Sequence, residues 1–161
     1  MVTKNEQLQQ MMQLYRAETG NKTLDMELVA EWAMKKGVAA PQPKTAKELL
    51  AAQFSQAARE EHRQDPKTGW SYRANHALRV SNNGKQLTLW VDIDDATRPQ
   101  MLASLTSRRQ QMVGDGTQLK IDETVWNNRH NEEEPINLVL DFTDDVEERL
   151  NSPDYDSGKV S

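Results

Sequence analysis

The stretch ALRVSNNGKQLTLWVDID, residues 77–94, decides how the middle of this chain folds. Asn83-Gly84 is the strongest short signal for a two-residue type I′ turn, because both central residues of that turn need a positive φ. The turn sets a register that begins at Asn82 opposite Lys85 and alternates side chains between two faces. One face then carries apolar pairs and the other polar pairs. The apolar face holds His76–Val91, Leu78–Leu89 and Val80–Leu87; the polar face holds Asn75–Asp92, Ala77–Trp90 and Arg79–Thr88.

Helical spacing of apolar residues predicts two helices before the hairpin, over residues 5–17 and 24–36. Thr23 or Asp25 can cap the second of them. A third helix is expected to begin at the capping box of Thr45 and Glu48 and to run to about residue 64. The order of three helices and a hairpin is that of a winged helix. The segment GVAAPQPK between the second and third helices is longer than the turn of ~3–4 residues in a compact helix-turn-helix.

Beyond the hairpin, Thr97 can cap a helix that runs to residue 113, where Gly114 and Gly116 are expected to end it. A short helix is expected near 123–130. The alternating Ile136, Leu138, Leu140 and Phe142 predict a third strand at 136–142. The overall expectation is an α+β domain over residues 1–150. It comprises a winged-helix-like core at about 5–93, a helical extension at 97–130, the strand, and a disordered acidic tail at 151–161.

Composition limits the classes of protein to which the chain can belong. Hydrophobic residues make up 36 % of the chain, below the usual ~45–50 %, so part of it is expected to lie outside any packed core. There is no cysteine, which excludes disulfides, cysteine zinc sites and thiol catalysis. The N-terminal segment lacks the pattern of a signal peptide, and no apolar run is long enough to span a bilayer. We therefore expect a soluble, cytoplasmic protein with no membrane partner.

Charge is distributed unevenly along the chain. Residues 1–121 carry 17 Lys and Arg against 13 Asp and Glu, whereas residues 122–161 carry 3 against 12. A mildly basic body with an acidic C-terminal part is the charge pattern that any functional interpretation has to explain.

DNA binding is the leading interpretation of the basic part. Arg and Gln present paired hydrogen-bonding groups that match guanine and adenine, and cations on a wing can contact phosphates. Glu60, Glu61 and Asp65 lie among these residues and would repel phosphates, so the alternative is an ordinary solvated face. The predicted contacts with double-stranded DNA are Lys47, Gln56, Arg59 and Arg63 on the third helix, and Arg73, Arg79 and Lys85 on the wing.

A protein partner is the second interpretation, and it rests on Trp90, on the adjacent Arg108 and Arg109, and on the acidic C-terminal segment. Trp90 lies on the outer face of the hairpin, where either the helix beyond the hairpin, over 99–113, or another chain must cover it. The helix is the favoured cover, and cover by a second chain would make a homodimer. Arg108 and Arg109 are adjacent on a helix, so they point about 100° apart and at most one faces a given partner. They can bind phosphate or an acidic partner, or pair with Asp92, Asp94, Asp95 or the C-terminal acids, which is the favoured alternative.

The acidic segment DFTDDVEERL, residues 141–150, places Phe142, Val146 and Leu150 on one side of a helix. Such a helix could dock on a basic groove of this chain or on another protein. The alternative is a terminus that only adds solubility.

Enzymatic signals are absent from the pattern of residues. The acids Asp92, Asp94 and Asp95 could in principle bind Mg²⁺, but solvated acids at the end of a strand explain them equally well. The histidines have no metal-binding spacing, and His76 is expected to be buried and hydrogen-bonded in the core. We therefore expect neither catalysis nor a cofactor nor a metal.

At QLTLWVDID, RRQQMVGDGTQL and LDFTDD the chain resembles a group of small bacterial proteins with no assigned activity. The resemblance covers roughly residues 24–148. It implies a bacterial or phage-related source and assigns no role to any residue.

Overall fold

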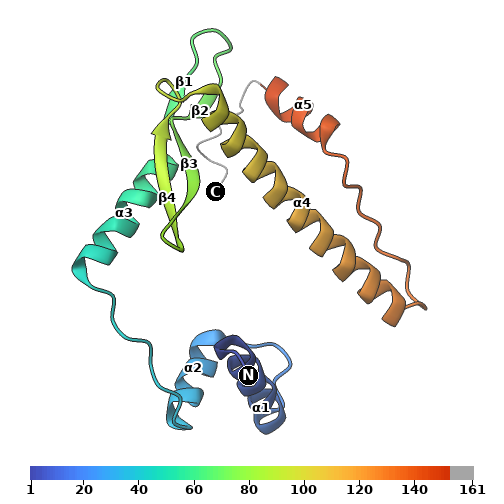
Figure 1. The fold of residues 1–161 in the computed structure, drawn as a ribbon. Coiled ribbons are helices and arrows are strands. Elements are labelled where there is room, and N and C mark those ends of the chain that lie inside the picture. Colours follow the sequence, from blue (N-terminus) through green and yellow to red (C-terminus); the bar gives the residue numbers. More distant parts are fainter. Residues whose placement is uncertain (153–161) are drawn as a thin grey trace. The chain divides into compact units, whose positions relative to one another are not determined.

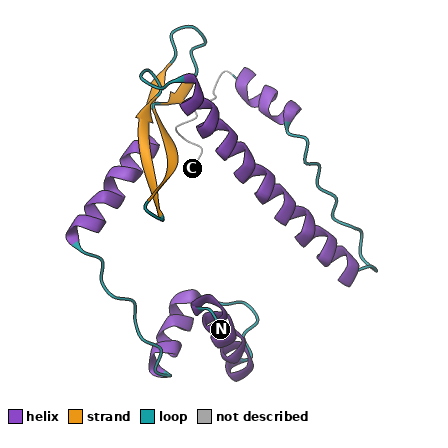
Figure 2. Cartoon of the chain, viewed as in Figure 1, coloured by secondary structure: helices purple, strands orange, loops and turns teal. Residues whose placement is uncertain are grey.

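The computed structural model describes residues 1–152 of the 161-residue chain. Within them are five helices and two antiparallel two-stranded sheets, so the chain is α+β as predicted (Figures 1 and 2). Its contacts divide the chain into two units, Met1–Ala46 and Lys47–Ser161. The predicted disordered tail falls almost entirely outside the described residues.

The first unit is a pair of helices, α1 (Lys4–Thr19) and α2 (Met26–Lys35). Thr3 and Glu6 form a capping box at the start of α1, and the Asp25 side chain accepts from the backbone N–H of Glu27 at the start of α2. Tyr15 and Trp32 pack edge to face at a centroid distance of 5.5 Å, and this contact holds the two helices together.

The second unit begins with α3 (Ala46–Glu60), which ends four residues earlier than predicted. Residues 62–64 form strand β1 (His62–Gln64), and it pairs with β2 (Ser71–Arg73). The turn between them is held by the Asp65 side chain, which accepts hydrogen bonds from the N–H and the hydroxyl of Thr68. Three-residue strands are too short to show an alternating pattern, which is why the sequence did not indicate this first hairpin.

The predicted hairpin is formed by β3 (Asn75–Asn82) and β4 (Lys85–Asp92), and its register is confirmed from Asn82–Lys85 to Asn75–Asp92. Asn83 and Gly84 have φ of 51° and 78°, as a type I′ turn requires. Ala74, which is fully buried, joins the two hairpins. Its N–H donates to the carbonyl of Glu61, and its carbonyl accepts from Ile93.

Helix α4 (Arg98–Arg129) is a single helix of 32 residues. Thr97 caps this helix, as predicted. It also forms a capping box with Gln100, which was not predicted from the sequence. The predicted break at Gly114 and Gly116 is wrong, because both glycines lie inside the helix with no positive φ. A glycine lowers helix stability by only about 1 kcal/mol relative to alanine, so the two glycines do not by themselves end the helix.

The strand predicted at 136–142 is not a strand among the described residues, and Figure 2 draws this segment as a loop between α4 and α5. The side chain of Asn127 hydrogen-bonds both the N–H and the carbonyl of Ile136, and Glu123 accepts from the N–H of Leu138. Side chains of α4 thus make hydrogen bonds to the backbone that a neighbouring strand would otherwise make. The acidic helix expected within 141–150 is present as α5 (Thr143–Asn151).

The described residues bury few side chains. The buried apolar residues are Tyr15, Val29, Ala33 and Ala74. Leu87 and Leu89, expected on the core face of the hairpin, are 42 % and 52 % exposed. Helices α1 and α2 belong to one unit and the hairpins to the other, and the winged-helix-like core at 5–93 stays a prediction. No described helix combines the length and the apolar character needed to cross a membrane.

Candidate functional site: an arginine-lined pocket

A pocket of about 230 Å³ lies in the second unit, where α3, the β3–β4 hairpin and α4 come together. Two contacts fix the end of α3 there: the Asn75 side chain donates to the carbonyl of Ala58, and the guanidinium of Arg59 lies 5.5 Å from the centre of the Trp90 ring. Helix α3 thus supplies cover for Trp90, which is half-buried. The sequence had favoured the helix beyond the hairpin for this role.

Most side chains around the pocket are polar or basic, and none is acidic. They are Arg59 from α3, Arg73 from β2, Asn75, His76, Ala77 and Arg79 from β3, Thr88 and Trp90 from β4, and Ser104, Ser107, Arg108 and Gln111 from α4. Four arginines therefore converge on one concave site, brought from four elements of the chain. Guanidinium groups stay charged at any physiological pH, so the pocket has a formal charge of about +4.

None of these four arginines has a carboxylate within 4.0 Å among residues 1–152. The described part of the chain therefore leaves their charges uncompensated. Arg108 in particular is partly desolvated, which lowers its pKa, and the charge of Arg73 lowers it further. An anion in the pocket would relieve this repulsion.

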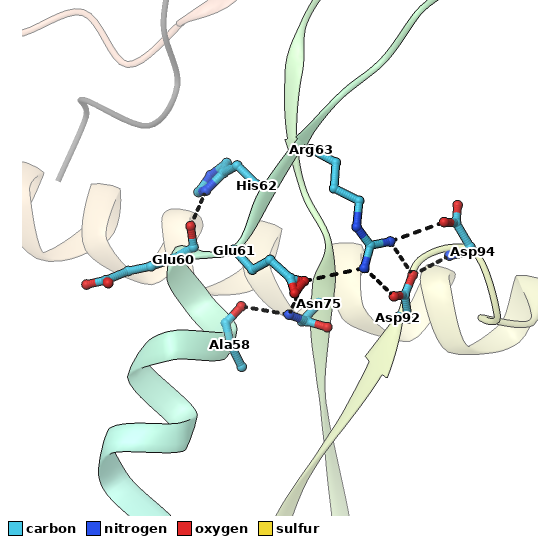
Figure 3. Close-up of polar contacts among 8 residues, drawn as sticks. All are labelled: Ala58, Glu60, Glu61, His62, Arg63, Asn75, Asp92 and Asp94. Carbon is cyan, nitrogen blue, oxygen red and sulfur yellow. Dashed lines mark hydrogen bonds and ion pairs between the residues drawn. The ribbon is translucent and has the colours of Figure 1, made fainter.

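Arg63 has the opposite environment, although the sequence grouped it with Arg59 (Figure 3). Its two Nη atoms bind the two oxygens of Asp92 at 2.9 and 2.6 Å, and they also contact Asp94 at 3.1 Å and Glu61 at 3.4 Å. The hydrogen bonds from Arg63, helped by the N–H of Asp94, lower the pKa of Asp92 to about 2. Arg63 thus joins β1 to the end of β4 and is not part of the pocket.

His76 lies in the pocket wall and is 6 % exposed, which confirms the expectation of a buried histidine. Its Nδ1 lies 3.2 Å from the hydroxyl oxygen of Ser104, itself 3 % exposed. Its Nε2 has no hydrogen-bond partner among the described residues. Burial lowers the pKa of His76; the main chain of Arg73 opposes this shift, and the charges of Arg108 and Arg73 add to it. The ring is therefore neutral at pH 7.

The remaining predicted contacts lie outside the pocket. Lys47 is exposed in the first turn of α3, and Lys85 is exposed at the hairpin turn. Gln56 donates to Glu60 one turn away, a bond that competes with base recognition.

Arg108 and Arg109 face different surroundings, as helical geometry predicted. Arg108 lines the pocket, whereas Arg109 lines a separate apolar groove with Met112, Val113 and Phe142. Neither forms an ion pair among residues 1–152, and Asp92 and Asp94 are taken by Arg63. The pairing of this Arg-Arg step with Asp92 or Asp94 is therefore wrong, whereas the C-terminal acids Asp154 and Asp156, which the favoured pairing also included, lie outside the described residues.

Sequence reasoning missed the contribution of α4 to the basic site. Ser104, Arg108 and Gln111 follow one another at helical spacing, on the side of α4 that contacts β3. This spacing was visible in the sequence, but nothing there indicated which element the stripe would face.

The described residues contain no cluster of three or more His, Asp or Glu side chains suited to a metal ion. Comparison of the chain with known protein families, curated proteins and solved structures finds no match. The resemblance to small bacterial proteins stays a prediction, and any function must be argued from the site itself.

Proposed function

We propose that this protein binds DNA without chemically altering it, and that the arginine pocket is the site where phosphate is held. The observation that carries the proposal is the convergence of Arg59, Arg73, Arg79 and Arg108 with no carboxylate partner in the described chain. Arginine binds phosphate oxygens through paired N–H groups, which makes it the side chain best suited to this role.

Electrostatics favours a polyanion over a neutral ligand at this site. Crowded positive charges repel one another, and a phosphate that enters the pocket replaces that repulsion by attraction. Binding to DNA also releases counterions condensed on the nucleic acid, a gain that grows with each cation that contacts a phosphate. Trp90 adds an aromatic surface at the edge of the same site, and aromatic side chains stack with bases.

The proposed face differs from a recognition helix with a wing. Of the seven contacts that the sequence suggested, Arg59, Arg73 and Arg79 line the pocket, while Arg63 is held by three carboxylates. Lys47, Gln56 and Lys85 would contact DNA only outside the pocket. Arg108 joins the site from α4.

The test is fluorescence anisotropy of the full chain with labelled single-stranded and duplex DNA at low salt. Arg108→Gln removes one pocket charge, and Arg109→Gln removes the adjacent charge outside the pocket, which makes it a matched control. We expect Arg108→Gln to weaken binding about tenfold, a typical loss for one charged hydrogen-bonding contact, and Arg109→Gln to change it little. Equal losses, or no binding by the wild type, would reject the pocket as the DNA site.

A second candidate function is protein binding, which we propose takes the form of self-association through α4. Leu105, Met112, Leu119 and Trp126 recur every seven residues and are between 43 % and 58 % exposed. Residues seven apart lie within about 20° of one another around an α-helix, so these side chains form one narrow apolar stripe, and a second copy of the chain offers an identical stripe.

Analytical ultracentrifugation measures this self-association directly. We expect the full chain to sediment at twice 18.4 kDa and Met112→Glu to sediment as a monomer. Gln110→Glu adds the same charge on the opposite side of α4 and should leave the dimer intact. A monomeric wild type would leave DNA binding as the sole candidate.

A further inference from the structure

The shape and the donors of the arginine pocket indicate more than a site for the DNA backbone. The pocket measures about 230 Å³, which is below the ~300–1,000 Å³ of sites that enclose a drug-sized ligand. Its walls come from α3, both hairpins and α4. A single phosphate with its adjoining sugar suits such a site better than a run of nucleotides does.

The charge of the pocket exceeds what one backbone phosphate can balance. A phosphodiester has one negative charge and two non-bridging oxygens. A phosphomonoester has a charge of about −1.5 to −2 near neutral pH and three strongly accepting oxygens. Four guanidinium groups that lack carboxylate partners in residues 1–152 therefore match a phosphomonoester more closely.

His76 supplies an additional donor. Its Nε2 is buried and has no partner among the described residues, whereas nearly all buried polar atoms in native proteins are paired. When the hydroxyl of Ser104 donates to Nδ1, the neutral ring holds its proton on Nε2, which is then a buried, unpartnered donor in a residue of the pocket wall. The buried hydroxyl of Ser104 fixes the ring position. Together the arginines and His76 offer more donors than the two free oxygens of a phosphodiester can accept.

We infer that the pocket takes a phosphomonoester group, either the terminal phosphate of a DNA strand or the phosphate of a free nucleotide. This inference rests on the proposed DNA-binding function and specifies its ligand. It predicts that strands are bound preferentially at phosphorylated ends.

The test compares two oligonucleotides of one sequence, labelled at the 3′ end, with either a phosphate or a hydroxyl at the 5′ end. We expect anisotropy titrations of the full chain to give at least tenfold tighter binding of the phosphorylated strand. This preference should fall severalfold in Arg108→Gln and persist in Arg109→Gln. Circular dichroism of both variants establishes that they remain folded.

Competition distinguishes the two sources of the group. If a mononucleotide or inorganic phosphate displaces the phosphorylated strand only at far higher concentration than an unlabelled copy of that strand, the ligand is a strand end. Displacement at equal concentration would assign the pocket to a free phosphorylated molecule. Equal binding of both oligonucleotides would overturn the inference and leave DNA binding standing. Binding of neither would overturn both.

Discussion

Gly114 offers a direct test of the continuity of α4. It lies near the middle of the helix, and a Cβ built on it meets no atom within 4 Å. Alanine at this position therefore causes no steric clash in the folded helix. It also lowers the conformational entropy of the unfolded chain. Host–guest scales place glycine about 0.8–1.0 kcal/mol below alanine in a helix interior, and Gly→Ala at compatible sites stabilises proteins by about 0.4–1 kcal/mol. We expect Gly114→Ala to stabilise the protein by roughly 0.5–1 kcal/mol.

Gly84 is the matched comparison for this substitution. A Cβ on Gly84 also meets nothing within 4 Å, but its φ of +78° lies in the left-handed region. That conformation costs an L-residue roughly 1–2 kcal/mol. The same chemical change is therefore expected to destabilise the protein at Gly84 and to stabilise it at Gly114, although space is available at both positions.

Urea denaturation followed by far-ultraviolet circular dichroism measures both effects. For a chain of this size, 1 kcal/mol corresponds to a shift of about 2–4 °C in melting temperature, so thermal melts provide a second measurement. If Gly114→Ala left stability unchanged or lowered it, the helix would be interrupted at this glycine, as the sequence alone indicated. If Gly84→Ala were stabilising, the type I′ turn itself would be wrong.

Three further predictions follow from individual side chains. If all four pocket arginines contact phosphates of single-stranded DNA, the logarithm of affinity should fall with the logarithm of salt with a slope of about −2.8, since each contact contributes about −0.7. Arg108→Gln should then reduce this slope to about −2.1 and Arg109→Gln should not; a wild-type slope near about −0.7 would mean that the arginines share one phosphate, as the inferred phosphomonoester requires, and a slope near zero would contradict phosphate binding in the pocket. Because the folded-state pKa of Asp92 is lowered from 3.8 to about 2, its ion pair stabilises the protein above that ordinary value and is lost as pH falls between 3.8 and about 2. Asp92→Asn should therefore lower the urea midpoint at neutral pH, and a difference from wild type that persisted unchanged at pH 2 would refute the ion pair. Asn127→Ala removes both side-chain hydrogen bonds to Ile136, so hydrogen exchange at the Ile136 amide should accelerate more than tenfold, and unchanged protection would mean that other contacts hold the segment.

The elements that the sequence predicted correctly depend on local chemistry. The β3–β4 register depends on Asn83 and Gly84, because their turn type admits a single pairing. The starts of α2 and α4 depend on Asp25 and Thr97, whose side chains bond the first free N–H groups of each helix. Such signals act over a few residues and can be read without knowledge of the rest of the fold.

Predictions were wrong where contacts with residues elsewhere in the chain determine the conformation of a segment and its own sequence pattern does not. The alternation at 136–142 is typical of a strand, but the segment's backbone is bonded by Asn127 and Glu123 of α4. The β1–β2 hairpin has strands of three residues, and its pairing is completed by Ala74, which bonds to Glu61 and Ile93. In both segments, residues outside the segment supply hydrogen bonds that fix its conformation, so its own sequence does not determine that conformation.

The sequence by itself determined that arginines are abundant around the hairpin, and that Arg108 and Arg109 point in different directions. Only the tertiary structure decided which of them are free to bind an anion. Arg63 and Arg59 lie four residues apart, yet Arg63 meets Asp92, which is 29 residues away along the chain, while Arg59 lies over Trp90. An ion pair forms only when distant carboxylates are brought within about 4 Å, and the path of the chain between them decides whether that happens.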